Sequence, residues 1–224
     1  MALVLNIETA TTNCSVSLSK DGETLILKED NSKGYSHAET LHVFIDDVFK
    51  TVNLTPSEID AIAVSKGPGS YTGLRIGVSS AKGLCFALNK PLISIDTLES
   101  LAHQVGIKEG FIIPMLDARR MEVYSSVFTS ELELYREIRA EVLTEDSYKS
   151  ILETSKVYFI GSGVKKTKSL IEHPNAIFID DKLPSAKEMG LLSELKYQKS
   201  DTEDVAYFEP YYLKDFVALK PKKS

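Results

Sequence analysis

The chain has 224 residues, of which 43% are hydrophobic and 26% are charged, a composition typical of a folded globular protein. A chain of this size buries roughly 70% of its unfolded surface, enough for one large core or two modest ones. The net charge of −6 excludes a basic field around the whole molecule, so nucleic acid could meet only a local patch. The two cysteines, Cys14 and Cys85, cannot form a disulfide framework, and their spacing matches no zinc motif.

The N-terminal stretch MALVLNIETA has no positively charged region and no cleavage site, so it is interpreted as a first strand rather than a signal peptide. No stretch approaches the eighteen or so apolar residues of a membrane span. We therefore expect a cytoplasmic protein.

Alternating apolar patterns and turn signals predict the same order of elements twice, three strands followed by helix, strand, helix, strand and helix. In the first half the strands are expected at 3–9, 14–21, 23–30, 59–65 and 91–95, and the helices at 36–52, 72–88 and 97–105. In the second half the strands are expected at 111–117, 122–130, 134–142, 157–163 and 176–180, and the helices at 147–155, 164–172 and 185–198.

Local signals support several of these boundaries. Asp21-Gly22 is a strong hairpin turn signal. Ser36 with Glu39 forms a capping box at the start of the first long helix, and Thr55 with Glu58 forms a second box before a short helix.

The doubled order predicts an α/β protein of two tandem domains, 1–108 and 109–215, followed by a flexible basic tail at 216–224. This layout resembles the actin/Hsp70/sugar-kinase (RNase H-like) superfamily. The resemblance implies a nucleotide cleft between the domains, which makes the phosphate-binding loops worth testing.

The glycine-rich stretch SKGPGSYTGLRIG at 65–77 lies between a predicted strand and a predicted helix. It matches neither the P-loop pattern nor the dinucleotide-binding pattern. Free N–H groups at the helix start make Gly69, Ser70 and Thr72 candidates for an anion site. The alternative is a tight turn that allows close packing.

Gly73, Gly77 and Ala81 recur every four residues along the predicted helix at 72–88. This spacing places three small side chains on one face, where another helix could approach closely. Glycine within a helix costs about 1 kcal/mol relative to alanine, so the close contact should matter. Periodicity leaves open whether the contact is internal or with another protein.

No catalytic or metal-binding constellation emerges. Ala10 stands in the first hairpin turn, where an ATPase of this superfamily needs a permissive glycine. His37 and His42 are five residues apart and cannot bind one metal as an i, i+4 pair could. Ser70 is in the wrong position for a hydrolase nucleophile elbow. We therefore expect no catalytic residue, no metal and no cofactor.

Several segments together resemble the TsaB (YeaZ) family, an accessory family in the synthesis of N6-threonylcarbamoyladenosine (t6A) in tRNA. The segments are ETATTNCSVSL (8–18), SHAETL (36–41), DAIAVSKGPGSYTGLRIGVSSAKGL (60–84) and DARRMEVY (117–124), with GSG (161–163) and EPYYL (209–213) as smaller echoes.

The resemblance implies a non-catalytic subunit that binds the transferase TsaD, with the ATPase TsaE joining the complex and tRNA contacted indirectly. It also implies that the helices beginning at Ser36 and Thr72 bind TsaD, and that a homodimer can form through the same two helices. The residues expected at this interface are Leu41, Ile45, Tyr71, Gly73, Arg75, Gly77 and Ala81. The alternatives are an ATP-binding kinase or ATPase of the same fold and a glycoprotease-like metallopeptidase.

Overall fold

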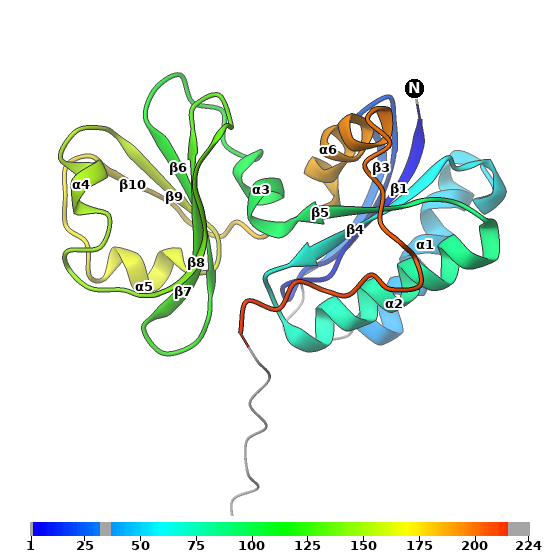
Figure 1. Ribbon diagram of the computed structural model, residues 1–224, viewed down its shortest axis with the longest axis horizontal. Helices are drawn as coiled ribbons and strands as arrows, with labels where there is room; N and C mark the ends of the chain where they lie inside the picture. Colours follow the sequence, from blue (N-terminus) through cyan, green and yellow to red (C-terminus); the bar gives the residue numbers. More distant parts are fainter. Residues whose placement is uncertain (1, 32–36, 215–224) are drawn as a thin grey trace, which may run out of the picture.

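The computed structural model describes residues 2–31 and 37–214, which form two five-stranded sheets with helices on their faces (Figure 1). The first sheet has the strand order β3-β2-β1-β4-β5 and the second the order β10-β9-β6-β7-β8. The first sheet contains β1 (Leu3–Glu8), β2 (Cys14–Lys20), β3 (Glu23–Asp30), β4 (Ala61–Gly67) and β5 (Leu92–Asp96). The second contains β6 (Phe111–Asp117), β7 (Glu122–Thr129), β8 (Leu134–Val142), β9 (Val157–Ile160) and β10 (Ala176–Ile179).

In each sheet the first three strands pair antiparallel and the later strands join in parallel. The helices are α1 (His37–Val52), α2 (Tyr71–Leu88), α3 (Thr97–Ala102), α4 (Lys149–Leu152), α5 (Val164–Lys168) and α6 (Ala186–Gln198), with a 3-10 turn η1 (Pro56–Glu58). The predicted α/β class and the repeated order of elements are confirmed.

The turn at Asp21-Gly22 and the capping box at Thr55 and Glu58 have the predicted geometry in the described part of the chain. Asp21 and Gly22 both have positive φ, as the tight turn between β2 and β3 requires. The Thr55 N–H donates to the Glu58 carboxylate at 2.7 Å, which fixes the start of η1. Ser36, the other predicted capping residue, lies outside the described residues.

The first sheet is covered on both faces. Leu5 and Ile7 of β1 point to the face covered by α1 and α2, where they join the largest core cluster. Val4 of β1 points to the opposite face and packs against Met189 and Leu192 of α6. The alternation of side chains along a strand therefore places α1 and α2 on one side of this sheet and α6 on the other.

Two helices pack on the sheet of the other half of the chain. Leu98 and Leu101 of α3 pack against Ile112 and Ile160 of the second sheet. The helix α6 follows the second sheet in sequence but packs on the first. The sequence prediction placed residues 185–198 with the second half, whereas the packing joins them to the first.

The C-terminal segment, residues 201–214, returns along the first half and ends between the two halves (Figure 1). Glu203 forms a β-bridge to Leu92, and the Tyr211 N–H donates to the Lys66 carbonyl at 2.7 Å. Within the described part of the chain, none of the helices is both long enough and apolar enough to span a bilayer.

Candidate functional site: the outer face of α1 and α2 and the interdomain cleft

The glycine-rich loop packs backbone against backbone on the turn between β1 and β2. The Ser70 N–H donates to the Ala10 carbonyl at 2.6 Å, and a Cβ added to Gly69 would lie 2.4 Å from the same oxygen. The Ser70 hydroxyl accepts from the Gly73 N–H at 3.3 Å and caps α2. The loop therefore needs glycine for close packing within the chain, and the Ser70 N–H is already used.

The small-residue face of α2 has the same internal cause. A Cβ on Gly73 would lie 2.1 Å from the Thr9 carbonyl oxygen, and one on Gly77 would lie 2.2 Å from the Thr9 hydroxyl. Ala81 is fully buried in the core of the first half. The structure thus corrects the prediction that Gly73, Gly77 and Ala81 face a partner, because their face meets the chain's own β1–β2 turn.

Leu41 and Ile45 of α1 require the same correction. Leu41 is 0% exposed and Ile45 is 6% exposed, and both belong to the core cluster beneath α1 and α2. An amphipathic helix buries one stripe against its own sheet, and these two residues lie on that stripe. They hold α1 on the sheet beneath it and offer no surface to a partner.

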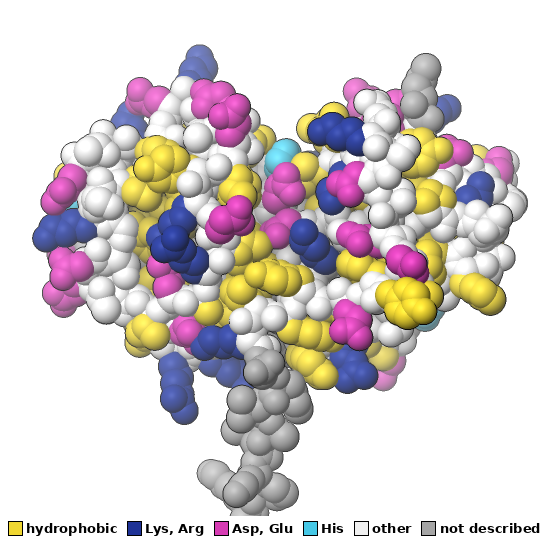
Figure 2. Space-filling model, in the orientation of Figure 1, with side chains coloured by type: hydrophobic (Ala, Val, Ile, Leu, Met, Phe, Trp, Pro, Cys, Tyr) yellow, Lys and Arg dark blue, Asp and Glu magenta, His cyan; other side chains and the backbone are white. Residues whose placement is uncertain are grey.

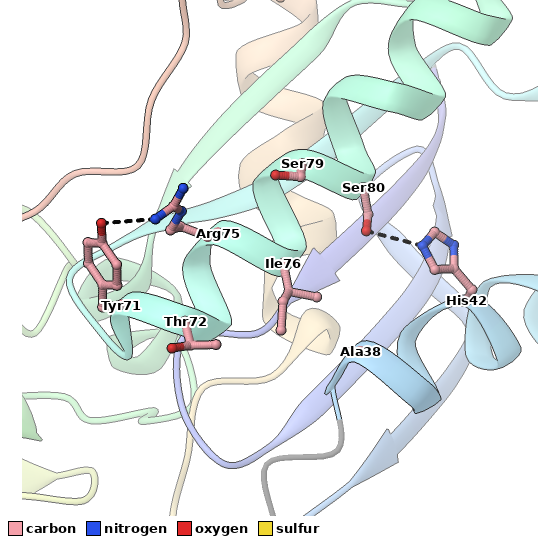
Figure 3. A pocket seen from close by; sticks show the side chains of 8 residues that line it. All are labelled: Ala38, His42, Tyr71, Thr72, Arg75, Ile76, Ser79 and Ser80. Atoms are coloured by element: carbon pink, nitrogen blue, oxygen red, sulfur yellow. Dashed lines mark hydrogen bonds between the residues drawn. The ribbon is translucent and has the colours of Figure 1, made fainter.

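The exposed sides of α1 and α2 enclose a groove with a volume of about 510 Å³ (Figure 3). Its walls are formed by side chains from both helices, Ala38, His42, Tyr71, Thr72, Arg75, Ile76, Ser79 and Ser80. Tyr71 and Arg75, two of the predicted interface residues, therefore lie at the surface. Thr72 was expected only as an anion-site candidate, and the sequence prediction assigned no binding role to the other five.

Short polar contacts fix the shape of the groove. The Arg75 guanidinium donates to the Tyr71 hydroxyl at 3.0 Å and lies over the Tyr71 ring, 5.3 Å from its centroid. Ser80 of α2 and His42 of α1 approach to 3.3 Å across the groove. Figure 3 shows these two pairs at its opposite ends, with the small side chains of Thr72 and Ser79 between them.

A stripe of exposed residues continues from the groove along α2. Thr72, Ser79 and Phe86 follow one another at intervals of seven residues, so successive members lie about 20° apart and all three lie within about 40° around the helix. Phe86 is 87% exposed, and Gly83 has no atom within 4 Å of the place a Cβ would occupy. The sequence signal that could have identified this surface was Phe86, a bulky apolar residue on the same helix face as Thr72 and Ser79. The sequence prediction instead followed the spacing of the glycines.

A cleft of about 850 Å³ lies between the two halves. It is lined by Ala10, Thr11, Thr12, Pro68, Gly69, Ser70, Tyr71, Thr72, Leu116, Asp117, Ala118, Arg119, Tyr124, Ser162, Leu183, Tyr211, Tyr212, Leu213 and Lys214. The candidate anion residues Gly69, Ser70 and Thr72 are thus brought together at its wall. Residues of the C-terminal segment occupy part of the same wall, and the ring of Tyr212 lies tilted at 33° to the ring of Tyr71, with 4.9 Å between their centroids.

The buried carboxyl group of Glu8 lies at the end of β1 and the half-buried carboxyl group of Asp96 lies at the end of β5. Burial raises the pKa of Glu8 to about 7, although its carboxylate accepts from the Ala10 N–H and the Ser65 hydroxyl. Burial likewise raises the pKa of Asp96 to about 6, and Asp96 caps α3. Across residues 2–31 and 37–214, no three His, Cys, Asp or Glu side chains lie close enough to hold a metal ion.

Comparisons with known proteins agree with this architecture. A family model described as "TsaD: tRNA N6-adenosine threonylcarbamoyltransferase" matches residues 32–222. The chain is 29% identical to the tRNA threonylcarbamoyladenosine biosynthesis protein TsaB of Haemophilus influenzae, over 97% of this chain and 95% of the relative. It is 28% identical to TsaB of Escherichia coli, over 97% of this chain and 96% of the relative.

A solved structure described as an uncharacterized protein with similarity to peptidase YEAZ, from Pseudomonas aeruginosa, has the same fold. It superimposes with a TM-score of 0.81 at 24% sequence identity, over 96% of this chain and all of the other. The chain therefore belongs to the TsaD family of the matching model and, within that family, to the TsaB (YeaZ) group.

Proposed function

We propose that this protein is a non-catalytic subunit in the synthesis of t6A in tRNA, and that it binds a TsaD-like threonylcarbamoyltransferase through the outer face of α1 and α2. Relatives that match nearly its whole length are named tRNA threonylcarbamoyladenosine biosynthesis proteins. The proposal extends to a TsaE-like ATPase as a further partner, to a homodimer formed through the same face, and to a cytoplasmic location.

The open groove between α1 and α2 is the observation that carries the partner-binding role. Small side chains such as Ala38 and Ser79 leave room for a helix of another protein to approach at the usual spacing of 8–10 Å. Phe86 and Val43, which are 87% and 56% exposed, supply apolar contact area on the same two helices. An exposed aromatic residue beside a groove is typical of a binding surface.

The β1–β2 turn supports a role without catalysis. In an ATPase of this fold that turn would have to present free backbone N–H groups to phosphate. Here the Ala10 N–H donates to Glu8 and the Ala10 carbonyl accepts from Ser70, so these two backbone groups are bonded within the chain. The C-terminal segment adds Tyr211 and Tyr212 to the cleft wall. We expect the purified chain to show no ATP hydrolysis above background.

A bulky side chain in the groove tests the interface. Ser79→Tyr fills the space between α1 and α2, and Ser150→Tyr adds the same bulk to an exposed position of α4 in the second half. We expect Ser79→Tyr to weaken the association with the TsaD-like partner at least tenfold, as measured by titration calorimetry, and Ser150→Tyr to leave it unchanged.

Both variants should unfold within about 0.5 kcal/mol of the wild type, because each change is at the surface. Partner affinity within twofold of wild type for Ser79→Tyr would show that this face is not the interface. If a pull-down with the wild-type chain recovers no TsaD-like protein and the chain binds only itself, a scaffold that pairs only with itself is the better description.

A further inference from the structure

We propose that a basic surface at the mouth of the interdomain cleft binds the phosphate backbone of RNA. This surface is formed by Arg119, Arg120, Lys165, Lys166, Lys168 and Lys214. The inference rests on the proposed function, because it assigns to this subunit a direct contact with the tRNA that the partner modifies.

Packing of α5 against the turn between β6 and β7 brings Lys166 next to Arg120, and Lys165 and Lys168 lie on the same short helix. Lys166 of α5 bonds to Asp117 at 2.9 Å and donates to the carbonyl oxygens of Arg120 and Glu122 at 2.6 and 3.0 Å. Lys214, at the end of the C-terminal segment, pairs with Glu122 on the same turn. One lysine therefore ties the helix to the turn, and a second ties the C-terminal segment to it.

Three of the six basic side chains have no ion-pair partner among the described residues and are available to bind a ligand. Asp117, Glu122 and Asp180 neutralise Lys166, Lys214 and Lys168 respectively. The side chains of Arg119, Arg120 and Lys165 are exposed and make no hydrogen bond or ion pair with any other described residue. In a chain of net charge −6, such a local surplus of positive charge favours an anionic partner.

The backbone of the β6–β7 turn holds the two arginines in place. Arg119 and Arg120 both have positive φ, at 71° and 49°. The Arg119 N–H donates to Asp117 at 2.7 Å, and its carbonyl accepts from the Glu122 N–H at 3.1 Å. These two bonds fix the backbone of the turn from which both arginine side chains extend into solvent.

The basic surface is continuous with the proposed partner interface. Tyr71 and Thr72 line both the groove on α2 and the cleft that contains Arg119 and Lys214. Tyr124 faces the same cleft and could stack on an unpaired base. Figure 2 shows Lys and Arg side chains gathered at the lower edge of the molecule, beside the point where the described chain ends.

The test uses the complex of the full chain with its TsaD-like partner and a fluorescein-labelled, unmodified tRNA transcript. Arg119→Gln, Arg120→Gln and Lys165→Gln are combined in one variant. The control combines Lys20→Gln, Lys187→Gln and Lys199→Gln, three exposed lysines on or near the α6 side of the first sheet, so the net charge changes equally. Binding is followed by fluorescence anisotropy across a range of salt concentrations.

We expect the first variant to bind tRNA at least tenfold more weakly, with a slope of log K against log salt that is smaller by about 2. The control should bind like the wild type, and both variants should still bind the partner. Equal affinities for the two variants would overturn the inference. Displacement of the tRNA by an equivalent phosphate concentration of ATP would also overturn it, in favour of a small nucleotide in the cleft. If the wild-type chain does not bind the TsaD-like partner at all, that result contradicts the proposed function.

Discussion

Thr9 connects the first hairpin turn to α2 and decides which residues α2 can carry. Its hydroxyl donates to the Gly73 carbonyl at 2.8 Å, and its own atoms occupy the space that side chains on Gly73 and Gly77 would need. The sequence correctly indicated that something packs closely on this stripe. It could not identify the neighbour, because a four-residue spacing describes one helix and contains no information about the turn sixty residues earlier.

Alanine at two glycines of α2 should therefore have opposite effects on stability. Gly73→Ala forces a Cβ against the Thr9 backbone and should lower the free energy of unfolding by about 1–3 kcal/mol. Gly83→Ala meets open space in the same helix and should raise it by about 0.5–1 kcal/mol. Urea denaturation measures both. A neutral Gly73→Ala would contradict the internal role given to this stripe.

Glu8 should make stability depend on pH. Its pKa rises from 4.5 to about 7 on folding because it is buried, so the folded chain keeps a proton that the unfolded chain releases. Ionisation then favours the unfolded state, and the free energy of unfolding should fall by about 3 kcal/mol as pH rises from about 4.5 to about 7. Asp96, whose pKa is also raised by burial, adds a smaller fall at lower pH.

Glu8→Gln should remove the larger part of that fall, since the amide oxygen can still accept from Ala10 and Ser65 but cannot ionise. The stability difference between the variant and the wild type should grow in favour of the variant between pH 4.5 and 7. Chemical denaturation at several pH values measures it, and the exposed Glu153→Gln controls for the loss of one carboxyl group. A difference that stays constant with pH would show that folding leaves the pKa of Glu8 unchanged.

At the scale of elements, the order of strands and helices could be predicted because it depends on local signals. The helix at 71–88 begins one residue before its predicted start, and the strands at 23–30, 111–117 and 134–142 have their predicted bounds. Short helices were overestimated: the predicted helix at 147–155 is a single turn, α4. A helix of that length depends on tertiary packing more than on propensity, so its ends are not encoded locally.

The packing partners of α3 and α6 could not be predicted, because an apolar stripe shows that a helix is buried and not which sheet buries it. The α6 helix covers the face of the first sheet that carries Val4, Ala63 and Ile93, and Ser193 donates to the buried Asn6 at 2.9 Å. Without α6 that apolar face and the Asn6 side chain would be exposed to water. The first half of the chain is therefore incomplete at residue 108.

A fragment of residues 1–108 should consequently fail to fold alone. Adding residues 183–214 through a long Gly/Ser linker should restore cooperative folding, since it supplies α6 and the C-terminal segment. Far-UV circular dichroism followed through thermal unfolding distinguishes the two. A sharp unfolding transition from the fragment of residues 1–108 would mean that α6 is dispensable for the first sheet.

At the scale of the whole molecule, the two halves are joined by more than the linker between them. Each half places a helix on the other's sheet, and the C-terminal segment runs along the first half before Lys214 pairs with Glu122 in the second. These connections favour a fixed cleft over one that opens and closes around a substrate. A fixed arrangement of the two halves agrees with the proposed role of positioning a partner.

Phe86 should therefore matter for association and not for folding. At 87% exposure its ring contributes little to the folded monomer, so Phe86→Ser should leave the free energy of unfolding within about 0.5 kcal/mol of the wild type. The same change should weaken binding to the TsaD-like partner, and any self-association, at least tenfold, which corresponds to about 1.4 kcal/mol. Sedimentation velocity measures self-association, and titration calorimetry measures partner binding.

The control variant Leu191→Ser removes a half-exposed apolar side chain from α6, on the opposite face of the first sheet, and should change neither self-association nor partner binding. If Phe86→Ser and Leu191→Ser weakened binding equally, the association would depend on nonspecific contact with exposed apolar surface, which would argue against a specific interface on α2.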